Sequence, residues 1–274
     1  PRSIVWKRVM DVNDRSLRHI VIGLGGTGNG IVREDGFNIT PASEIMAILC
    51  LSKDLEDLKQ KLANIFIGNT IQGKPVFFFY LNAVGAMAIL LKDAIKPNLV
   101  QTLEGNPAIL HGGPFASIAQ GTNSIIATKM GLSISNYVIT EAGFAADLGA
   151  EKFFDIKCAS SGLKPKAAVI VTTVRAMRHH GGAKKDELET ASAGKVMEGC
   201  SNLGKHIENV KLFGVTPIVA INWFPNDTDA EIEMIQDFCK GMGMKAIVCK
   251  GFAEGGKGMT ELATEVVQLV ENNH

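Results

Sequence analysis

Several features that would assign a protein to a common class are missing from this sequence of 274 residues. Its five cysteines are odd in number and contain no C-x-x-C pair, which argues against a disulfide framework and a zinc site. Lys plus Arg equals Asp plus Glu at 28 each, so the net charge predicts no attraction to nucleic acid or an anionic membrane. We therefore expect reduced thiols and a cytoplasmic location.

Long hydrophobic runs are also missing. The longest, AAVIVTTV and TPIVAIN, are far shorter than the ~20 residues that a membrane-spanning helix needs. No signal peptide opens the chain, and the first residue is Pro1 rather than Met. We therefore expect that an N-terminal part of the protein is missing from this sequence or has been processed away. The 46% of apolar residues and 20% of charged residues are typical of a globular chain with an ample core.

Short β-branched runs alternate with helical periodicities along the chain. The predicted strands are His19–Gly23, Ala108–His111, Tyr137–Thr140, Ala167–Val174, Thr216–Asn222 and Lys245–Cys249. The predicted helices are Ala42–Asn64, Leu81–Ala94, Phe115–Met130, Ala145–Cys158, Lys195–Phe213, Asp229–Met242 and Gly258–Glu271. Continuous apolar strands between helices indicate a parallel sheet covered on both faces. We predict an α/β fold with a mostly parallel sheet, and a boundary near residue 205 that separates residues 1–205 from a smaller α/β domain, 206–274.

The first glycine-rich segment, Gly23–Gly28, matches the dinucleotide-binding pattern G-x-G-x-x-G and follows the strand HIVI. The residues after it, NGIVREDGFNITP, contain glycines and a proline and carry no helical apolar stripe. A dinucleotide site needs a helix there, so a structural turn is the favoured interpretation.

The second glycine-rich segment, Gly251–Gly258, is close to the phosphate-binding pattern G-x-x-x-x-G-K-[ST]. A predicted strand precedes it and a predicted helix follows it. Gly258 stands where the pattern requires Ser or Thr, so the hydroxyl that would ligate Mg²⁺ is missing, and Thr260 comes two residues late. A working phosphate loop is the less favoured interpretation here.

Long segments of the chain resemble the formate–tetrahydrofolate ligase family. The segments that carry the resemblance are GAMAILLKDAIKPNLVQTLE (85–104), HGGPFASIAQG (111–121), TEAGFAADLGAEKFFDIKC (140–158), TVRAMRHHGG (173–182), HIENVKLFGV (206–215), AINWFPNDTDAEIE (220–233) and FAEGGKG (252–258). TVRAMRHHGG is similar to one of the two signature stretches of the family. The other, a KGGAAGGGY-like run, and the family's Walker A loop of TPxGEGKT type are absent.

In a full-length ligase those two motifs precede the equivalent of Pro1, and a further domain follows the equivalent of the last helix. The resemblance therefore implies an internal fragment. It implies that residues 1–205 form the later part of a P-loop-NTPase-like nucleotide domain, and that residues 206–274 contribute the folate site. The chain departs from the family pattern at Ser117, Gln120, Ala145 and Ala159.

The resemblance also implies the chemistry: ATP-dependent ligation of formate to tetrahydrofolate through formyl phosphate, which gives 10-formyltetrahydrofolate, ADP and phosphate. The implied partners are formate, ATP with Mg²⁺, tetrahydrofolate, optionally a monovalent cation, and further copies of the full-length chain. No residue of this chain is assigned as a metal ligand. The phosphoryl-transfer step needs positioning and charge neutralisation around the phosphates.

Candidate site residues follow the predicted strands, because ligands of open α/β sheets bind outside the carboxyl ends of strands. Arg175 stands at such an end and could stabilise transferring charge, although an Arg that opens a surface helix is equally common. His180, Gly181 and Gly182 follow in the loop and are candidates for binding a cofactor. His111 ends another strand and is expected to be a hydrogen-bonded structural residue.

Three phenylalanines are assigned by the resemblance. Phe144 is expected to support the adenine ring. Phe224, followed by Pro225, and Phe252 are expected to cover the two faces of the pterin, with Phe252 standing where the family commonly has Trp. The alternative is that Phe224 and Phe252 anchor their loops in a core.

Three functions stay open at this point. The first is the ligase itself, and the second is a catalytically incomplete chain that binds folate or nucleotide. The third is a nicotinamide-dependent oxidoreductase that would use Gly23–Gly28.

Overall fold

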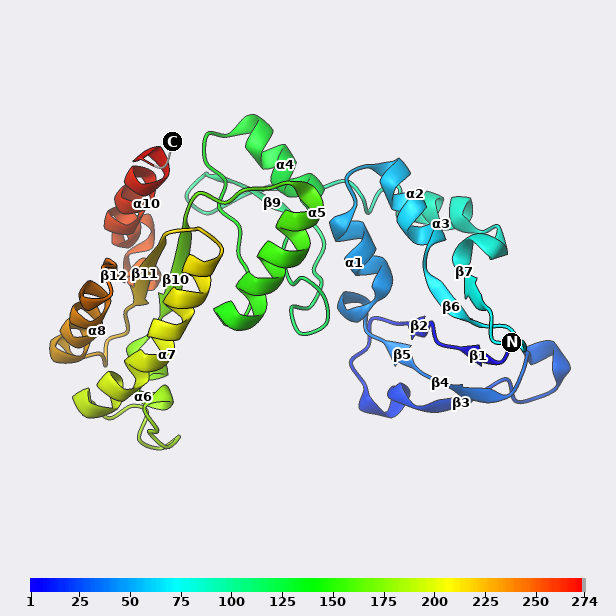
Figure 1. The fold of residues 1–274 in the computed structure, drawn as a ribbon, viewed down its shortest axis with the longest axis horizontal. Coiled ribbons are helices and arrows are strands. Elements are labelled where there is room, and N and C mark those ends of the chain that lie inside the picture. Colours follow the sequence, from blue (N-terminus) through cyan, green and yellow to red (C-terminus); the bar gives the residue numbers. More distant parts are fainter. Residues whose placement is uncertain (273–274) are drawn as a thin grey trace. The chain divides into compact units, whose positions relative to one another are not determined.

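The computed structural model describes residues 1–272 and shows a mixed α/β protein (Figure 1). The strands are β1 (Ser3–Ile4), β2 (Arg8–Val9), β3 (Ile20–Ile22), β4 (Arg33–Asp35), β5 (Phe37–Asn38), β6 (Phe66–Asn69), β7 (Pro75–Phe77), β8 (Asn98–Gln101), β9 (Pro107–Leu110), β10 (Ala168–Thr172), β11 (Pro217–Asn222) and β12 (Ala246–Cys249). The helices are α1 (Glu44–Leu51), α2 (Leu55–Ala63), α3 (Val84–Leu91), α4 (Ile125–Ile134), α5 (Ala159–Ser161), α6 (Val174–His180), α7 (Ala193–Leu212), α8 (Asp229–Gly241), α9 (Gly251–Glu254) and α10 (Thr260–Asn272).

The chain divides into two compact units. Pro1–Phe144 and Lys152–Gly162 form the first unit, and Ala145–Glu151 and the chain from Leu163 onward form the second. The second unit is built on a parallel three-stranded sheet in the order β10-β11-β12. Its strands follow one another along the chain and are joined by helices, as parallel strands require.

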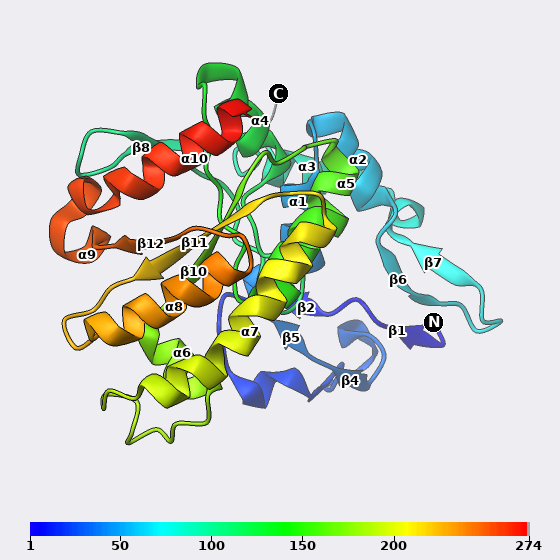
Figure 2. The same ribbon diagram turned by 60° about the vertical axis from the view of Figure 1, so that its left-hand side comes forward.

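Both faces of this sheet are covered, which gives the second unit three layers (Figure 1, Figure 2). Val219 and Ile221 of β11 pack into a core with α6, α7 and α8 on one face. Ile218 and Ala220 alternate with them and pack against α10 on the other face. A strand buried on both sides is apolar throughout, which explains the continuous run PIVAI. The predicted strands and covering helices of this region are confirmed.

The longest helix, α7, owes its position to an apolar stripe. Its buried residues include Val196, Cys200, Leu203 and Ile207, which recur at helical spacing and therefore share one face. Ser192 caps its first turn by accepting from the Lys195 backbone N–H.

The predicted domain boundary at residue 205 lies inside α7, which is continuous from Ala193 to Leu212. In addition β10, which precedes residue 205, pairs along its length with β11, which follows it. The two compact units thus divide the chain elsewhere than the predicted domains do. The sequence shows where a new strand–helix unit begins, but it does not show which earlier strand the new strand pairs with. Here the new strand, β11, pairs with β10.

The first unit does not follow the prediction of a mostly parallel sheet. Its strands form the antiparallel sets β1-β6-β7, β3-β4 and β8-β9, with only the two-residue β2-β5 pair parallel. Where strands that are neighbours in sequence pair, as in β3-β4, β6-β7 and β8-β9, the cause is local turn chemistry. In β8-β9, Gly105 has φ +82° and the Thr102 N–H donates to the Asn106 carbonyl, which closes a hairpin. The predicted strand Tyr137–Thr140 is not a strand in the structure.

Helices of the first unit are shorter than predicted. The predicted helix Ala42–Asn64 is divided into α1 and α2, because each has its own N-terminal cap. Ser43 caps α1, and Asp54 caps α2 by accepting from the Asp57 N–H at 2.8 Å. The predicted helix at Phe115 begins only at Ile125, after its cap Ser124. Residues of α1, α2 and the Phe78 turn form the core of this unit: Leu49, Leu58, Leu62, Ile65 and Phe78.

No helix within residues 1–272 is long and apolar enough to cross a membrane.

Candidate functional site

The glycine-rich segment Gly23–Gly28 is a hairpin connection. It joins β3 to β4, which pair antiparallel with Ile22 opposite Arg33. Gly23, Gly25 and Gly26 all have positive φ, which explains why glycine occupies them. A dinucleotide site requires a helix directly after the loop, to hold the pyrophosphate at its N-terminus, and β4 stands there instead. The structural interpretation is confirmed, and nothing in the segment supports a nicotinamide cofactor.

The second glycine-rich segment is wound into helical turns. Gly251–Glu254 is α9, and Gly255–Met259 continues as a 3₁₀ helix before α10. The Lys250 N–H donates to the Gly258 carbonyl at 3.0 Å, and the Thr260 hydroxyl donates to the Lys257 carbonyl at 3.0 Å. A phosphate loop instead directs free N–H groups into an open concavity. The segment therefore does not fit a phosphate in this conformation.

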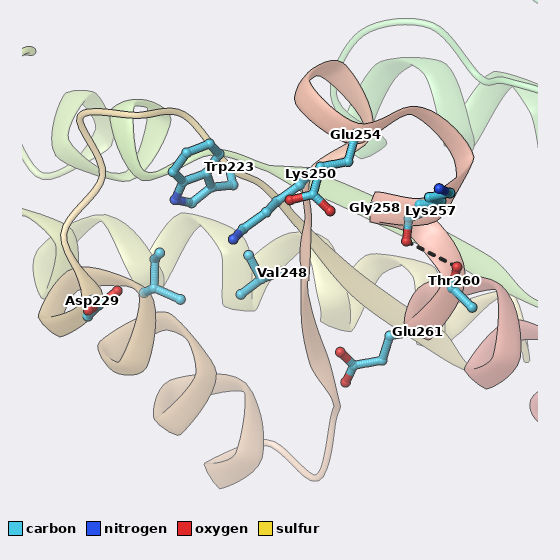
Figure 3. Close-up of a pocket in the computed structure, with 10 residues that line it drawn as sticks. Trp223, Asp229, Val248, Lys250, Glu254, Lys257, Gly258, Thr260 and Glu261 are labelled. Atoms are coloured by element: carbon cyan, nitrogen blue, oxygen red, sulfur yellow. Dashed lines mark hydrogen bonds between the residues drawn. The ribbon is translucent and has the colours of Figure 1, made fainter.

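A cavity of about 460 Å³ lies in the second unit, where β11 and β12 end (Figure 3). Its volume is in the range of small-molecule sites, which are roughly 300–1,000 Å³. It is lined by Trp223, Asp229, Ile232, Val248, Lys250, Glu254, Lys257, Gly258, Thr260 and Glu261. Sheet topology explains its place, because the loops beyond the carboxyl ends of parallel strands open at the same edge.

The cavity combines an aromatic ring with charges of both signs. Lys250 follows β12 and extends toward Trp223, with its Nζ 5.0 Å from the centre of the indole ring (Figure 3). This is the distance of a cation–π contact. Asp229 begins α8, and Glu261 lies in the first turn of α10, so two helix N-termini bring carboxylates to the rim. Such a cavity suits a flat, polar ligand that carries both hydrogen-bond donors and acceptors.

The two predicted pterin residues follow the strands of the same edge: Phe224 lies in the loop after β11, and Phe252 lies in α9 after β12. β11 and β12 remain paired up to Asn222 and Cys249, and the Trp223 N–H donates to the Cys249 carbonyl at 3.0 Å. Phe224 and Phe252 lie just beyond these paired ends. The two residues are 45% and 98% exposed, and neither lines the cavity. Phe252 is thus not a core anchor in this conformation.

Pro225 lies within a tight turn that presents Phe224. The Asp227 N–H donates to the Phe224 carbonyl at 3.0 Å, and the Phe224 N–H donates to Asp227 Oδ2 at 2.8 Å. Proline suits the second position of such a turn because its φ is already set. Burial raises the pKa of the Asp227 carboxyl, and its bond from the Phe224 N–H opposes that shift.

Arg175 lies at the same edge, in the first turn of α6 directly after β10. Its Nη1 is 2.5 Å from Glu189 Oε1, and both side chains are 57% exposed. The guanidinium is therefore reachable from solvent, and a carboxylate already neutralises it. A ligand anion at this edge would have to compete with Glu189.

His180, Gly181 and Gly182 close α6 at its other end, one short helix away from Arg175. Each glycine has a structural reason. A Cβ on Gly181 would lie 1.8 Å from the carbonyl oxygen of Lys195 in α7, and Gly182 has φ +83°. His180 is exposed at the same turn.

Phe144 belongs to the first unit and has an unusual backbone. Its φ is +64°, a region that costs an L-residue on the order of 1–3 kcal/mol. The residue is 73% exposed. A strained, exposed aromatic residue has no packing explanation and is a candidate for contact with a planar ligand.

His111 is a structural residue, as the sequence predicted. It is buried, with Nδ1 2.5 Å from Ser124 Oγ and Nε2 2.8 Å from the Ala94 carbonyl oxygen. It lines a second cavity of about 320 Å³ within the first unit, together with Gly112 and Gly113. Both ring nitrogens already have partners, so the imidazole is fixed in place. Gln120, where the sequence departs from the family it resembles, is buried with no partner for Nε2.

Sequence reasoning missed a buried ion pair in the second unit. Arg178 of α6 and Glu231 of α8 are each 1% exposed, and Arg178 Nη2 lies 2.6 Å from Glu231 Oε2. One signal for half of this pair was present: Thr228-x-x-Glu231 before an apolar run is the pattern of a helix-capping box, and the structure contains that capping box. Nothing local identifies Arg178 as its partner.

The ion pair predicts a pH dependence of stability. Bonds from Arg178 and from backbone N–H groups outweigh burial and lower the pKa of Glu231 from 4.5 to about 2, while Asp227 and Glu189 are the other carboxylates near Arg178. A depressed carboxyl pKa stabilises the fold fully above pH 4.5, and this contribution is lost as the pH falls toward 2. Between pH 5 and 2.5 we expect wild type to lose roughly 2 kcal/mol more unfolding free energy than Glu231→Gln.

Urea unfolding across that pH range measures this difference. Glu208→Gln removes an exposed carboxylate from α7 and serves as the control. Parallel pH curves for wild type and Glu231→Gln would contradict the prediction.

These observations describe an α/β protein with a cavity of small-molecule size at the carboxyl edge of a parallel sheet. Within residues 1–272 no group of three or more His, Cys, Asp or Glu side chains is placed to hold a metal ion. The formate–tetrahydrofolate ligase family matches residues 1–274, and the chain belongs to that family.

Relatives that carry the name formate–tetrahydrofolate ligase are similar along the whole chain. The proteins of Mesorhizobium japonicum and Pelagibacter ubique are both 58% identical, over 271 and 272 residues, each alignment covering 99% of this chain. That of Rhizobium meliloti is 58% identical over 273 residues, or 100% of this chain. The alignments cover 48%, 48% and 49% of these relatives, so the chain spans about half their length.

Proposed function

We propose that this chain carries the folate-binding edge, and part of the nucleotide-binding region, of an enzyme that ligates formate to tetrahydrofolate using ATP. The family match over residues 1–274 is the observation that supports this most directly. The cavity at the carboxyl edge of β11 and β12 supplies a site of suitable size and polarity.

In the proposed reaction a formate oxygen attacks the γ-phosphorus of ATP, and ADP leaves, which produces formyl phosphate. The N10 amine of tetrahydrofolate then attacks the formyl carbon, and phosphate leaves as 10-formyltetrahydrofolate forms. Arg175 is proposed to leave its ion pair with Glu189 and to stabilise the negative charge that develops on the phosphoryl group. His180, Gly181 and Gly182 are proposed to shape the loop beside it.

On the nucleotide side, Phe144 is proposed to support the adenine ring of ATP, in a region related to P-loop nucleotide domains. Mg²⁺ would accompany ATP and neutralise its phosphates. Its ligands, and those of an optional monovalent cation, are not assigned to residues of this chain. The whole protein is proposed to act in the cytoplasm as a homo-oligomer.

On the folate side, Phe224, Pro225 and Phe252 are proposed to receive the pterin. Phe252 lies in α9 and is 98% exposed, so closure of its ring over a ligand would bury a large apolar face. The cavity beside it, with Lys250 and Glu261, would receive the polar remainder of the substrate. In this proposal the chain by itself binds folate without turning it over.

The experiment for this proposal is a calorimetric titration of the chain with tetrahydrofolate. We expect weak binding by wild type and a loss of about 1–3 kcal/mol for Phe252→Ala, or roughly 5- to 150-fold in Kd, by analogy with base stacking on aromatic residues. Phe252→Trp should keep or improve the affinity because the larger ring covers more of the pterin.

Tyr80→Ala is the matched control, since Tyr80 is an aromatic residue of the first unit that is 62% exposed. ATP binding should be indifferent to both changes at residue 252. Equal folate affinity of wild type and Phe252→Ala would remove Phe252 from the site.

A further inference from the structure

The Arg178–Glu231 pair has the geometry of a two-pronged clamp. Arg178 Nε donates to Glu231 Oε1 at 2.8 Å, and Nη2 donates to Oε2 at 2.6 Å. Two parallel bonds of this kind fix the relative orientation of both side chains, which a single Lys–carboxylate contact does not. The two residues are 53 positions apart in the chain and join α6 to the start of α8.

The remaining hydrogen-bonding groups of the pair reach two loops. Arg178 Nη1 donates to the Leu188 carbonyl at 2.9 Å, and Nη2 donates to the Asn226 carbonyl at 3.5 Å. Glu231 Oε1 accepts from the Ser192 N–H at 2.8 Å. One buried pair thereby holds backbone atoms of residues 181–192 and of residues 223–228.

The 223–228 loop is attached to Glu231 a second time. The Thr228 hydroxyl donates to Oε2 at 2.7 Å and its N–H donates at 3.3 Å. Phe224, Pro225 and Asn226 are all exposed, so little apolar burial holds the tip of this loop. The ion pair therefore restrains the far end of this loop, at Asn226 and Thr228, while the bond from the Trp223 N–H to the Cys249 carbonyl restrains its start.

The anchored loops carry residues of the candidate site. Residues 223–228 present Phe224 and Trp223, and residues 181–192 present Glu189, which pairs with Arg175. We propose that Arg178 and Glu231 are positioning residues that hold these two loops in a single arrangement. Resting on the proposed function, this arrangement sets the affinity for tetrahydrofolate by keeping Phe224 in place before the ligand arrives.

The decisive variant is the double substitution Arg178→Met/Glu231→Leu. Either single change leaves a buried charge unpaired and risks unfolding, whereas replacing both partners by apolar residues of similar size often preserves stability. The double variant removes every side-chain hydrogen bond from the pair to the two loops and replaces both residues by apolar side chains of similar size. Lys205→Met, which breaks the exposed pair with Glu208, is the control for losing an ion pair.

Hydrogen exchange read by mass spectrometry tests the positioning role. In the double variant we expect amides of residues 183–192 and 223–228 to exchange at least about 10-fold faster, because their restraints are gone, with β11 and β12 unchanged. If the pair only stabilised the fold, its replacement would change exchange throughout the second unit. If the apolar residues restored that stability, exchange would change nowhere. Wild-type exchange rates in both loops of the double variant would overturn the proposal.

Titration of the same variants with tetrahydrofolate tests the link to the ligand. The double variant should bind at least about 10-fold more weakly than wild type and Lys205→Met, as a loop that must be ordered on binding lowers affinity. If the loops loosen while the affinity stays the same, the positioning of the loops holds and the folate role of Phe224 fails. If wild type itself binds no tetrahydrofolate, the proposed function fails, while the exchange result still decides the positioning role.

Discussion

The purified 274-residue chain is expected to show no formate-dependent release of ADP above roughly one thousandth of the rate of a full-length ligase, since removing stabilising groups around a transition state costs factors of this size. Phosphoryl transfer depends on backbone N–H groups, a Lys and Mg²⁺ around the phosphates. The sequence contains no complete G-x-x-x-x-G-K-[ST] motif. The one segment that approaches it, Gly251–Gly258, is wound into helical turns.

Gly258→Thr is the informative control, because it completes the motif in sequence. We expect no gain of activity, since a Cβ at residue 258 would lie 2.6 Å from the carbonyl oxygen of Lys250. A side chain there would strain the turn rather than present a hydroxyl to Mg²⁺. Robust formate-dependent ADP release, measured with a coupled assay, would contradict this and would assign Gly251–Gly258 as a phosphate loop after all.

Gly199→Ala is expected to destabilise the second unit by about 3 kcal/mol, because it overpacks a backbone contact. Gly199 lies on the face of α7 that meets α6, and a Cβ there would be 2.0 Å from the Met177 carbonyl oxygen. That atom belongs to the backbone of α6, so it cannot move without displacing the helix that carries Arg175 and Arg178.

Gly194→Ala, in the same helix, is the matched control. A Cβ on Gly194 meets nothing within 4 Å, so the change should stabilise the unit by up to about 1 kcal/mol through helix propensity. Urea unfolding followed by circular dichroism measures both variants. Equal unfolding midpoints for Gly199→Ala and Gly194→Ala would show that the α6–α7 contact can separate at little cost.

Much of the second unit could be predicted from the sequence, because its signals are local. The run PIVAI is apolar at every position, which only a strand buried on both faces requires. The apolar stripe of α7 and the cap at Ser192 define that helix without reference to other elements. The motifs at residues 173–182 and 252–258 also led to the family, since they can be recognised letter by letter.

The strand pairing of the first unit was harder to predict, because its local signals are weak. Its strands are two to four residues long, and their pairing depends on turns such as that at Gly105 rather than on a repeating pattern. An apolar run of that length does not distinguish a parallel from an antiparallel partner. The same limit applied to Gly23–Gly28, whose glycine spacing fits both a nucleotide loop and a hairpin turn until the next element is known.

The sequence by itself determined the family, the α/β class, and the strands that precede Arg175, Phe224 and Phe252, because each rests on neighbouring residues. Only the tertiary structure decided that Gly251–Gly258 closes on itself, and that Lys250 lies over Trp223. It alone also paired Arg178 with Glu231. These contacts join residues from different elements, and a buried charge acquires its partner only when the helices pack together.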